Sequence, residues 1–127
     1  MYFAKITSAV LLVALMGCTQ SGPQIAPVHG RVTLDGQPLK YAGVVFRSPG
    51  KNPSGGTTDE NGNYELIYKL GVKGAPVGMN QVSILQDTRR VPGPQRVPAR
   101  YNEKSELQHE VKPGDNEINF PLTTDEK

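Results

Sequence analysis

Thr-Thr-Asp-Glu-Asn-Gly-Asn-Tyr-Glu-Leu, residues 57–66, reads as a tight turn that leads into a β-strand. Asp59, Asn61 and Gly62 are residue types that bond to their own backbone or adopt positive φ, so they reverse the chain at low cost. After the turn, side chains at alternate positions (Tyr64, Leu66, Tyr68 against Glu65, Ile67, Lys69) suit a half-buried strand. The stretch therefore predicts a β-hairpin turning at Asn61-Gly62.

The rest of the chain repeats this pattern of a short alternating run followed by a turn rich in Gly, Pro, Asn or Asp. The predicted strands cover residues 28–34, 43–47, 64–70, 77–86, 107–111 and 117–122. The expected inward-facing side chains are Val28, Val32, Leu34, Leu39, Val44, Phe46, Val82, Ile84, Ile118, Phe120 and Leu122. Residues 48–56, 71–76 and 87–100 are expected to be loops, and Pro121 places the last strand at a sheet edge.

Composition supports the same fold class. The chain has 127 residues, enough for one small domain, and its 14 Gly and 11 Pro favour a turn-rich β protein. Outside the N-terminus no long window repeats with helical spacing. About seven short strands without a crossover helix predict an all-β protein, a single antiparallel β-sandwich over residues 28–122.

The N-terminus has the features of a secretory signal. Lys5 precedes an almost unbroken apolar run over residues 6–16, which is too short to span a bilayer, and Gly17 is a small residue before the expected cut. Cys18 is the only cysteine, so it forms no intramolecular disulfide. Leu15-Met16-Gly17-Cys18 resembles the lipid-modification site of bacterial lipoprotein precursors, although Met16 is less typical at its position. The alternative is an unlipidated signal peptide with a coincidental cysteine.

These features predict the organisation of the chain. Residues 1–17 are expected to be a signal peptide cleaved between Gly17 and Cys18, residues 18–27 a flexible tether, and residues 123–127 a polar tail. The protein is expected to be held to a membrane by lipid on Cys18, so its expected location is the cell membrane or cell envelope.

Charge argues against broad electrostatic binding to nucleic acid. Removing residues 1–17 takes away one Lys, so 14 basic residues become 13 against 12 acidic residues, a net charge of +1. A local basic stretch is nevertheless present among prolines; it comprises Arg89, Arg90, Arg96, Arg100 and Lys104. We interpret it as a solvated loop, with contact to phospholipid head groups or an anionic polymer as the alternative.

Three motifs in order make the chain resemble the carboxypeptidase regulatory-like domain proteins, in particular small secreted lipoproteins of planctomycete bacteria. The G-x-V-x-x-x-G-x-P-L pattern is carried by Gly30, Val32, Gly36, Pro38 and Leu39. The T-D-x-x-G-x-Y/F-x-L pattern is carried by Thr58, Asp59, Gly62, Tyr64 and Leu66, and the P-x-K/R-Y element by Pro98, Arg100 and Tyr101. The resemblance spans nearly the whole mature chain. It implies a transthyretin-like Greek-key β-sandwich without enzymatic activity.

Three kinds of chemistry are tested against the residues. Transthyretin-related hydrolases share the implied fold, but the position of their first-strand His is Val32 here, and their C-terminal Tyr-Arg-Gly-Ser is missing. Ring-cleaving dioxygenases on a related sandwich use two Tyr and two His around iron; only His29 and His109 exist, and their spacing defines no metal site. Residues 59–63 faintly resemble a calcium loop, but position and context favour turn geometry alone. No catalytic residue, metal or cofactor is predicted.

The predicted function is therefore a non-catalytic, envelope-associated structural or binding module. A carbohydrate-binding module is the second hypothesis, with Tyr41, Tyr68 and Tyr101 as candidate ligand contacts. A transthyretin-related hydrolase is the third. His109 is in phase with Leu107 and Val111, which predicts a half-buried side chain with a backbone partner, or a ligand contact as the alternative. His29 is expected on the polar face.

Overall fold

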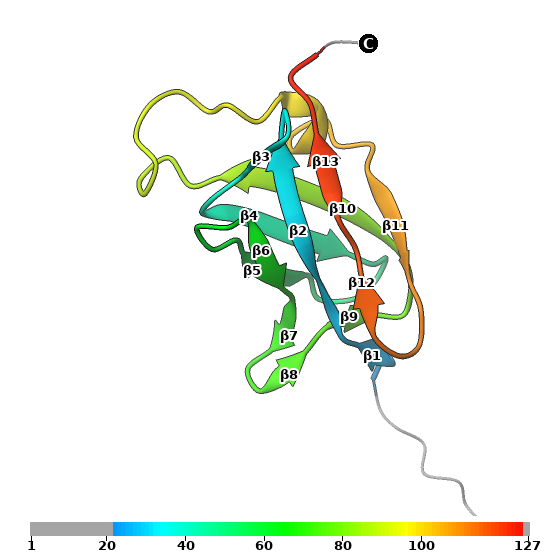
Figure 1. Ribbon diagram of the computed structural model, residues 1–127. Helices are drawn as coiled ribbons and strands as arrows, with labels where there is room; N and C mark the ends of the chain where they lie inside the picture. The colour runs from blue at the N-terminus through cyan, green and yellow to red at the C-terminus, as the bar shows by residue number, and fades with distance from the viewer. Residues whose placement is uncertain (1–21, 126–127) are drawn as a thin grey trace, which may run out of the picture.

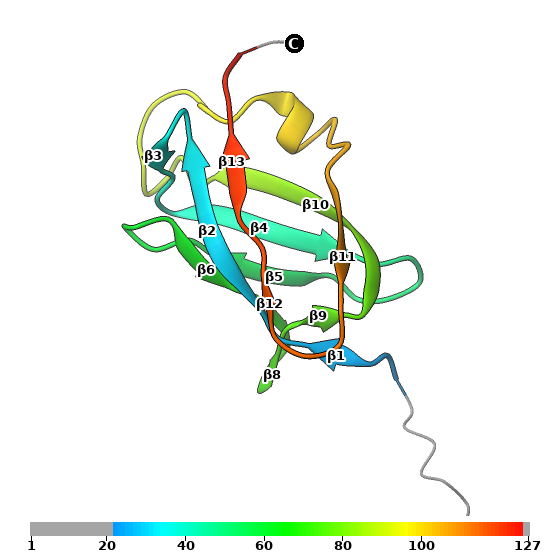
Figure 2. The same ribbon diagram turned by 45° about the vertical axis from the view of Figure 1, so that its right-hand side comes forward.

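The computed structural model describes residues 22–125 (Figures 1 and 2). The signal peptide, its cleavage site and Cys18 lie outside the described residues. The strands are β1 (Ile25–Ala26), β2 (Val28–Leu34), β3 (Gln37–Pro38), β4 (Ala42–Arg47), β5 (Ser54–Thr57), β6 (Asn63–Glu65), β7 (Ile67–Lys69), β8 (Val72–Lys73), β9 (Ala75–Pro76), β10 (Gly78–Gln86), β11 (Gln108–Val111), β12 (Asn116–Glu117) and β13 (Phe120–Leu122). One short 3-10 helix, η1 (Ala99–Tyr101), precedes β11.

Two sheets stack face to face, which confirms the predicted all-β sandwich. One sheet has the order β11-β10-β4-β5-β7-β8. The other is built around β2, with β12 and β13 along one edge and β3 and β6 along the other. β1 pairs with β9 as a separate two-stranded ladder at one end.

Buried apolar side chains from both sheets meet between the layers. The side chains predicted to face inward are all buried, and Phe46 of β4 meets Phe120 of β13 edge to face at 6.0 Å between ring centroids. Such aromatic pairs add to the stabilisation that burial alone provides. Val97, in the segment expected to be an irregular loop, is also buried, so that segment closes one end of the core.

The turn of residues 57–66 is present, but the predicted hairpin is wrong. Asp59 N–H donates to the Asn63 carbonyl at 2.9 Å, and Gly62 N–H donates to the Asp59 carbonyl at 3.1 Å. The two arms, however, belong to different sheets, because β5 pairs with β4 whereas β6 pairs with β2. The chain then returns to the first sheet, where Ile67 pairs with Gly55. The single strand predicted over 64–70 is therefore two strands, β6 and β7.

The closing strand also differs from the purely antiparallel prediction. β12 and β13 run parallel to β2, with Asn116 opposite Val28 and Leu122 opposite Leu34. The reason is that the turn at 112–115 carries the chain from β11 in one sheet to the other sheet, so it does not close a hairpin. Pro121 lies in an edge strand, as predicted.

Several segments expected to be loops or tether contain strands. β5 lies within the loop predicted over 48–56, and Ser54 at its start is fully buried. β8 and β9 occupy the loop predicted over 71–76. The expected tether ends earlier than residue 27, because Ile25 and Ala26 pair with Pro76 and Ala75. The expected tail is held in part, since Thr124 N–H and its hydroxyl donate to Asp35 at 2.9 and 2.8 Å.

Candidate functional site

A shallow, open depression of about 1020 Å³ lies on the outer face of the β2 sheet. Alternation along β2 places Val28, Val32 and Leu34 in the core and sends His29, Arg31 and Thr33 outward. The neighbouring strands complete the lining with Asn63, Tyr64 and Glu65 on β6, and with Glu117, Asn119 and Pro121 along the β12–β13 edge.

His29 is the titratable centre of this depression. Its Nε2 lies 3.0 Å from Asp115 Oδ2, and its side chain is 43% exposed. The hydrogen bond that the His29 imidazole donates to the Asp115 carboxylate raises the pKa of His29, and the nearby carboxylates of Glu117 and Glu65 act in the same direction. His29 lies on the polar face, as predicted, but its pairing with Asp115 across 86 positions was not predicted.

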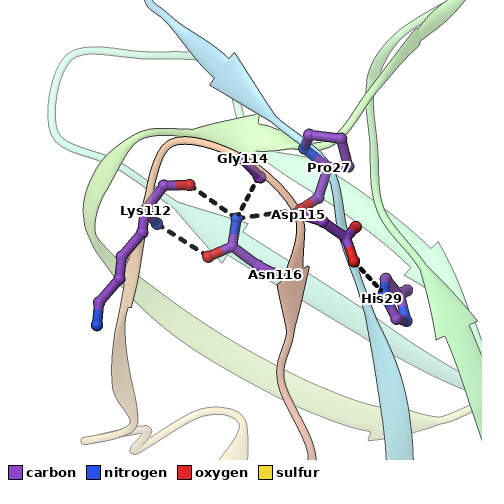
Figure 3. A network of polar contacts seen from close by, with 6 residues as sticks. All are labelled: Pro27, His29, Lys112, Gly114, Asp115 and Asn116. Carbon is purple, nitrogen blue, oxygen red and sulfur yellow. Dashed lines mark hydrogen bonds and ion pairs between the residues drawn. The ribbon is translucent and has the colours of Figure 1, made fainter.

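The turn that delivers Asp115 is held by the side chain of Asn116 (Figure 3). Asn116 Nδ2 donates to the carbonyls of Lys112, Gly114 and Pro27 at 2.8, 3.1 and 3.1 Å. Its Oδ1 accepts from Lys112 N–H at 2.9 Å. This single amide closes the turn and joins it to the chain just before β2, so the position of Asp115 beside His29 is determined by the fold.

Gly30 of β2 lies at a close crossing of two backbones. A Cβ atom on Gly30 would lie 1.8 Å from the carbonyl oxygen of Ile118, so only glycine fits there. The same carbonyl accepts the Tyr64 hydroxyl at 2.6 Å. Burial raises the pKa of Tyr64, which keeps that hydroxyl protonated and donating. Tyr64 is thus a structural residue.

The arrangement is suited to binding polar groups by hydrogen bonds and ion pairs. It presents the guanidinium of Arg31 and the imidazole of His29 beside the carboxylates of Glu65 and Glu117. Within residues 22–125, no group of three or more His, Cys, Asp and Glu side chains is placed to hold a metal ion. The hydrogen-bond partner that the structure gives the His29 imidazole is the Asp115 carboxylate.

The tyrosines predicted as ligand contacts do not share a face. The guanidinium carbon of Arg90 lies 3.8 Å from the ring centroid of Tyr41, and the Tyr41 hydroxyl donates to Glu60 at 3.1 Å. The Tyr101 hydroxyl accepts Thr123 N–H at 3.2 Å near the C-terminal end of the sandwich. Tyr68 lies on β7, at the opposite end (Figure 1). The structure therefore shows no common aromatic platform among the three.

His109 is exposed, which contradicts the predicted half-buried position. β11 is the edge strand of its sheet, so one side of the imidazole is open to solvent. The ring still lies edge to face with Phe120, at 6.4 Å between ring centroids. Its predicted backbone contact is present, since Nδ1 lies 3.0 Å from the carbonyl oxygen of Glu110.

Parts of the basic stretch contact the protein itself. Arg90 stacks on Tyr41, Arg89 Nε lies 3.3 Å from Asp87 Oδ1, and Arg100 donates to the backbone carbonyl of Asp125 at 2.7 Å. Arg89 and Arg90 also border a second open depression, of about 770 Å³, on the outer face of the other sheet.

Asp59, in the stretch 59–63 that faintly resembles a calcium loop, has a structural role in the turn. Asp59 Oδ1 accepts the backbone N–H groups of Asn61 and Asn63 at 2.8 and 3.0 Å. The carboxylate thus forms an Asx-type turn.

The fold and the depression define a class of protein: a small β-sandwich domain with a polar concave face on one sheet. No family model matches the chain, and no curated protein sequence matches it. Among solved structures, a DUF3823 family protein from Parabacteroides merdae is similar, with 16% identity and a TM-score of 0.49 over 80% of this chain and 47% of that chain. A 9R-lipoxygenase from Cyanothece is similar at 19% identity and a TM-score of 0.39, over 80% of this chain and 16% of that chain. The chain spans about half the length of the first of these.

Proposed function

We propose that the chain is an exported lipoprotein, anchored through Cys18, whose β-sandwich is a non-catalytic envelope-associated binding or structural module. The observation that carries the proposal is the short interval between the lipid-modification sequence and the domain. Cys18 follows Leu15-Met16-Gly17, and β1 begins at Ile25, seven positions further on. A folded domain joined so closely to such a cysteine suits attachment to a membrane surface.

We assign the domain to the carboxypeptidase regulatory-like class, and the roles of its motif residues support that assignment. Gly36 and Gly62 have φ values of 83° and 80°, so each occupies a turn position that favours glycine. Leu39 is buried, and Thr58 Oγ1 donates to the Leu39 carbonyl and accepts from Ala42 N–H inside the core. The motifs thus describe turns and packing, which agrees with a class defined by its fold and not by a reaction.

The depression around His29 is the face on which we expect an envelope partner to bind. It is an open depression of about 1020 Å³, and its lining includes both positive and negative groups. A partner with both hydrogen-bonding and charged groups fits such a surface better than an apolar one does.

Replacing the cysteine tests the proposal. The full chain and its Cys18→Ser variant are produced in a bacterium that processes lipoproteins, and the cells are fractionated. The unmodified chain is expected in the membrane fraction, released by detergent but not by high salt, whereas Cys18→Ser is expected in the soluble exported fraction, because lipid holds the protein and charge does not. Equal distribution of the two chains between fractions contradicts the anchor.

A further inference from the structure

The hairpin formed by β7 and β8 carries an unusual concentration of exposed apolar side chains. Five large apolar side chains are exposed in the described part of the chain, and three of them, Ile67, Leu70 and Val72, lie on this hairpin. Leu70 is fully exposed at the tip, beside Gly71. Two-residue hairpin tips favour Asn, Asp and Gly, so a leucine there is not explained by turn chemistry. Exposed apolar groups gathered at one projecting point indicate a contact surface.

Polar side chains on the same hairpin complete the pattern of a membrane-contacting segment. Tyr68, Lys69 and Lys73 flank the apolar tip, and residues 67–73 contain no acidic residue. Lys73 lies 3.4 Å from Glu65 of β6, with both side chains more than half exposed. Tyrosine and lysine are the residue types that sit at the level of lipid head groups, while a leucine beyond them reaches the acyl chains.

The hairpin lies at the end of the molecule where the chain enters the domain. Gly74, directly after β8, packs so closely on β1 that a Cβ atom there would lie 2.1 Å from the carbonyl oxygen of Ala26. Ala75 and Pro76 then pair with Ala26 and Ile25. Both views place β1 and β8 at the same end, opposite the C-terminal end of β13 (Figures 1 and 2).

The length of chain between Cys18 and β1 limits the distance between the β1 end of the domain and the proposed lipid on Cys18. Seven positions separate Cys18 from Ile25, which span about 25 Å at full extension. A short tether of this kind gives the hairpin a high effective concentration at the bilayer surface, so even a weak contact is populated.

We propose that the β7–β8 hairpin, residues 67–73, is a second membrane contact that inserts Leu70 into the surface of the bilayer. This inference rests on the proposed lipid anchor at Cys18, which supplies proximity to the bilayer. The contact orients the domain, with the β1 end toward the lipid and the C-terminal end away from it.

A single tryptophan tests the contact, because the chain contains none. The Leu70→Trp variant, produced from Cys18 onward, is coupled through its sole thiol to a maleimide lipid in vesicles of phosphatidylcholine and phosphatidylglycerol. Its emission is expected to move to shorter wavelength relative to the uncoupled protein, and lipids brominated on their acyl chains are expected to quench it. The matched control is Thr88→Trp, at an exposed position just after β10 and away from the hairpin, which is expected to show neither change.

Identical emission and quenching for the two variants overturns the contact. Far-ultraviolet circular dichroism checks that both variants remain β-sandwiches. Chemical coupling does not depend on whether cells acylate Cys18. A failed hairpin contact therefore appears as an unshifted Leu70→Trp on the vesicles, whereas a failed anchor appears as soluble wild-type protein in the fractionation.

Discussion

Single glycines determine where backbones touch in this sandwich. The backbone of Gly30 packs against the carbonyl of Ile118, that of Gly74 against the carbonyl of Ala26, and that of Gly56 against the carbonyl of Glu65. These contacts explain a failure of sequence reasoning at β5. Ser-Gly-Gly-Thr has no apolar alternation and reads as a loop, yet it forms a strand because it pairs with β4. Glycine is needed at position 56 because Glu65 at the end of β6 passes too close for any side chain there. The residue that makes glycine necessary at position 56 is Glu65, nine positions further on, and the stretch 54–57 carries no signal of that contact.

Adjacent glycines in β5 provide a matched test of this close approach. A Cβ on Gly56 would lie 2.2 Å from the Glu65 carbonyl oxygen, whereas one on Gly55 would lie 3.7 Å from the Val44 carbonyl oxygen. We expect Gly56→Ala to lower the free energy of unfolding by about 1–3 kcal/mol, the usual range for forced overpacking. Gly55→Ala is expected to change it by less than about 1 kcal/mol, since the new contact is an ordinary one. Urea unfolding measures both, and equal losses contradict the proposed clash.

The pair of His29 and Asp115 predicts a specific pH dependence. Because Asp115 raises the pKa of His29 in the folded state, the stabilisation is present below the unfolded pKa of about 6.5 and is lost as pH rises through the raised folded value. Asp115→Asn should therefore lower the melting temperature more at about pH 5.5 than at about pH 8.5, in low salt. Both side chains are exposed, so the effect is expected to be small.

The control for that experiment is Glu106→Gln, which removes a carboxylate at an exposed position outside the depression. It should show no comparable difference between the two pH values. A loss of melting temperature in Asp115→Asn that is the same at both pH values contradicts the role given to His29.

At the scale of elements, the sequence predicts strands better than it predicts their partners. β2, which alternates clearly between buried apolar and outward polar side chains, has the predicted bounds, and β4, β10 and β11 differ from theirs by one residue at one end. The switch of sheets at 57–66 and the parallel course of β12 and β13 were missed. A turn motif specifies a reversal of the chain, but which sheet receives the next strand depends on long-range pairing.

The candidate site illustrates the same limit. Alternation along β2 correctly places His29 on the polar face, and the Pro113-Gly114 turn was predicted. Their meeting depends on the parallel course of β12, which no local pattern indicates. The hairpin contact was also missed, since exposure of Leu70 is a property of the folded chain.

The strand β1 shows where the domain begins, and truncation tests that boundary. A chain starting at Val28 loses the pairing of Ile25 and Ala26 with β9, the buried Ala26 side chain and the Pro27 carbonyl that Asn116 contacts. We expect a clearly lower melting temperature than for a chain starting at Gly22, because β9 then has an unpaired edge and the core is opened. Equal melting temperatures contradict the assignment of β1 to the folded domain.

At the scale of the whole molecule, the sandwich is polarised from one end to the other. β1 and the β7–β8 hairpin lie at one end, and the segment over 87–101, with Arg100 holding residues 123–125, closes the other (Figure 2). No helix among the described residues is long and apolar enough to cross a membrane. In the proposed orientation, the lipid on Cys18 and the hairpin tip share one side, and the depression around His29 lies on the outer face of the β2 sheet.

Mass spectrometry of the N-terminus of the protein purified from its membrane tests this account most directly. We predict a mature chain that begins at Cys18 and carries acyl groups on that residue, with residues 1–17 absent. A chain that retains Met1, or one that begins at an unmodified Cys18, would contradict the anchor on which the orientation and the hairpin contact depend.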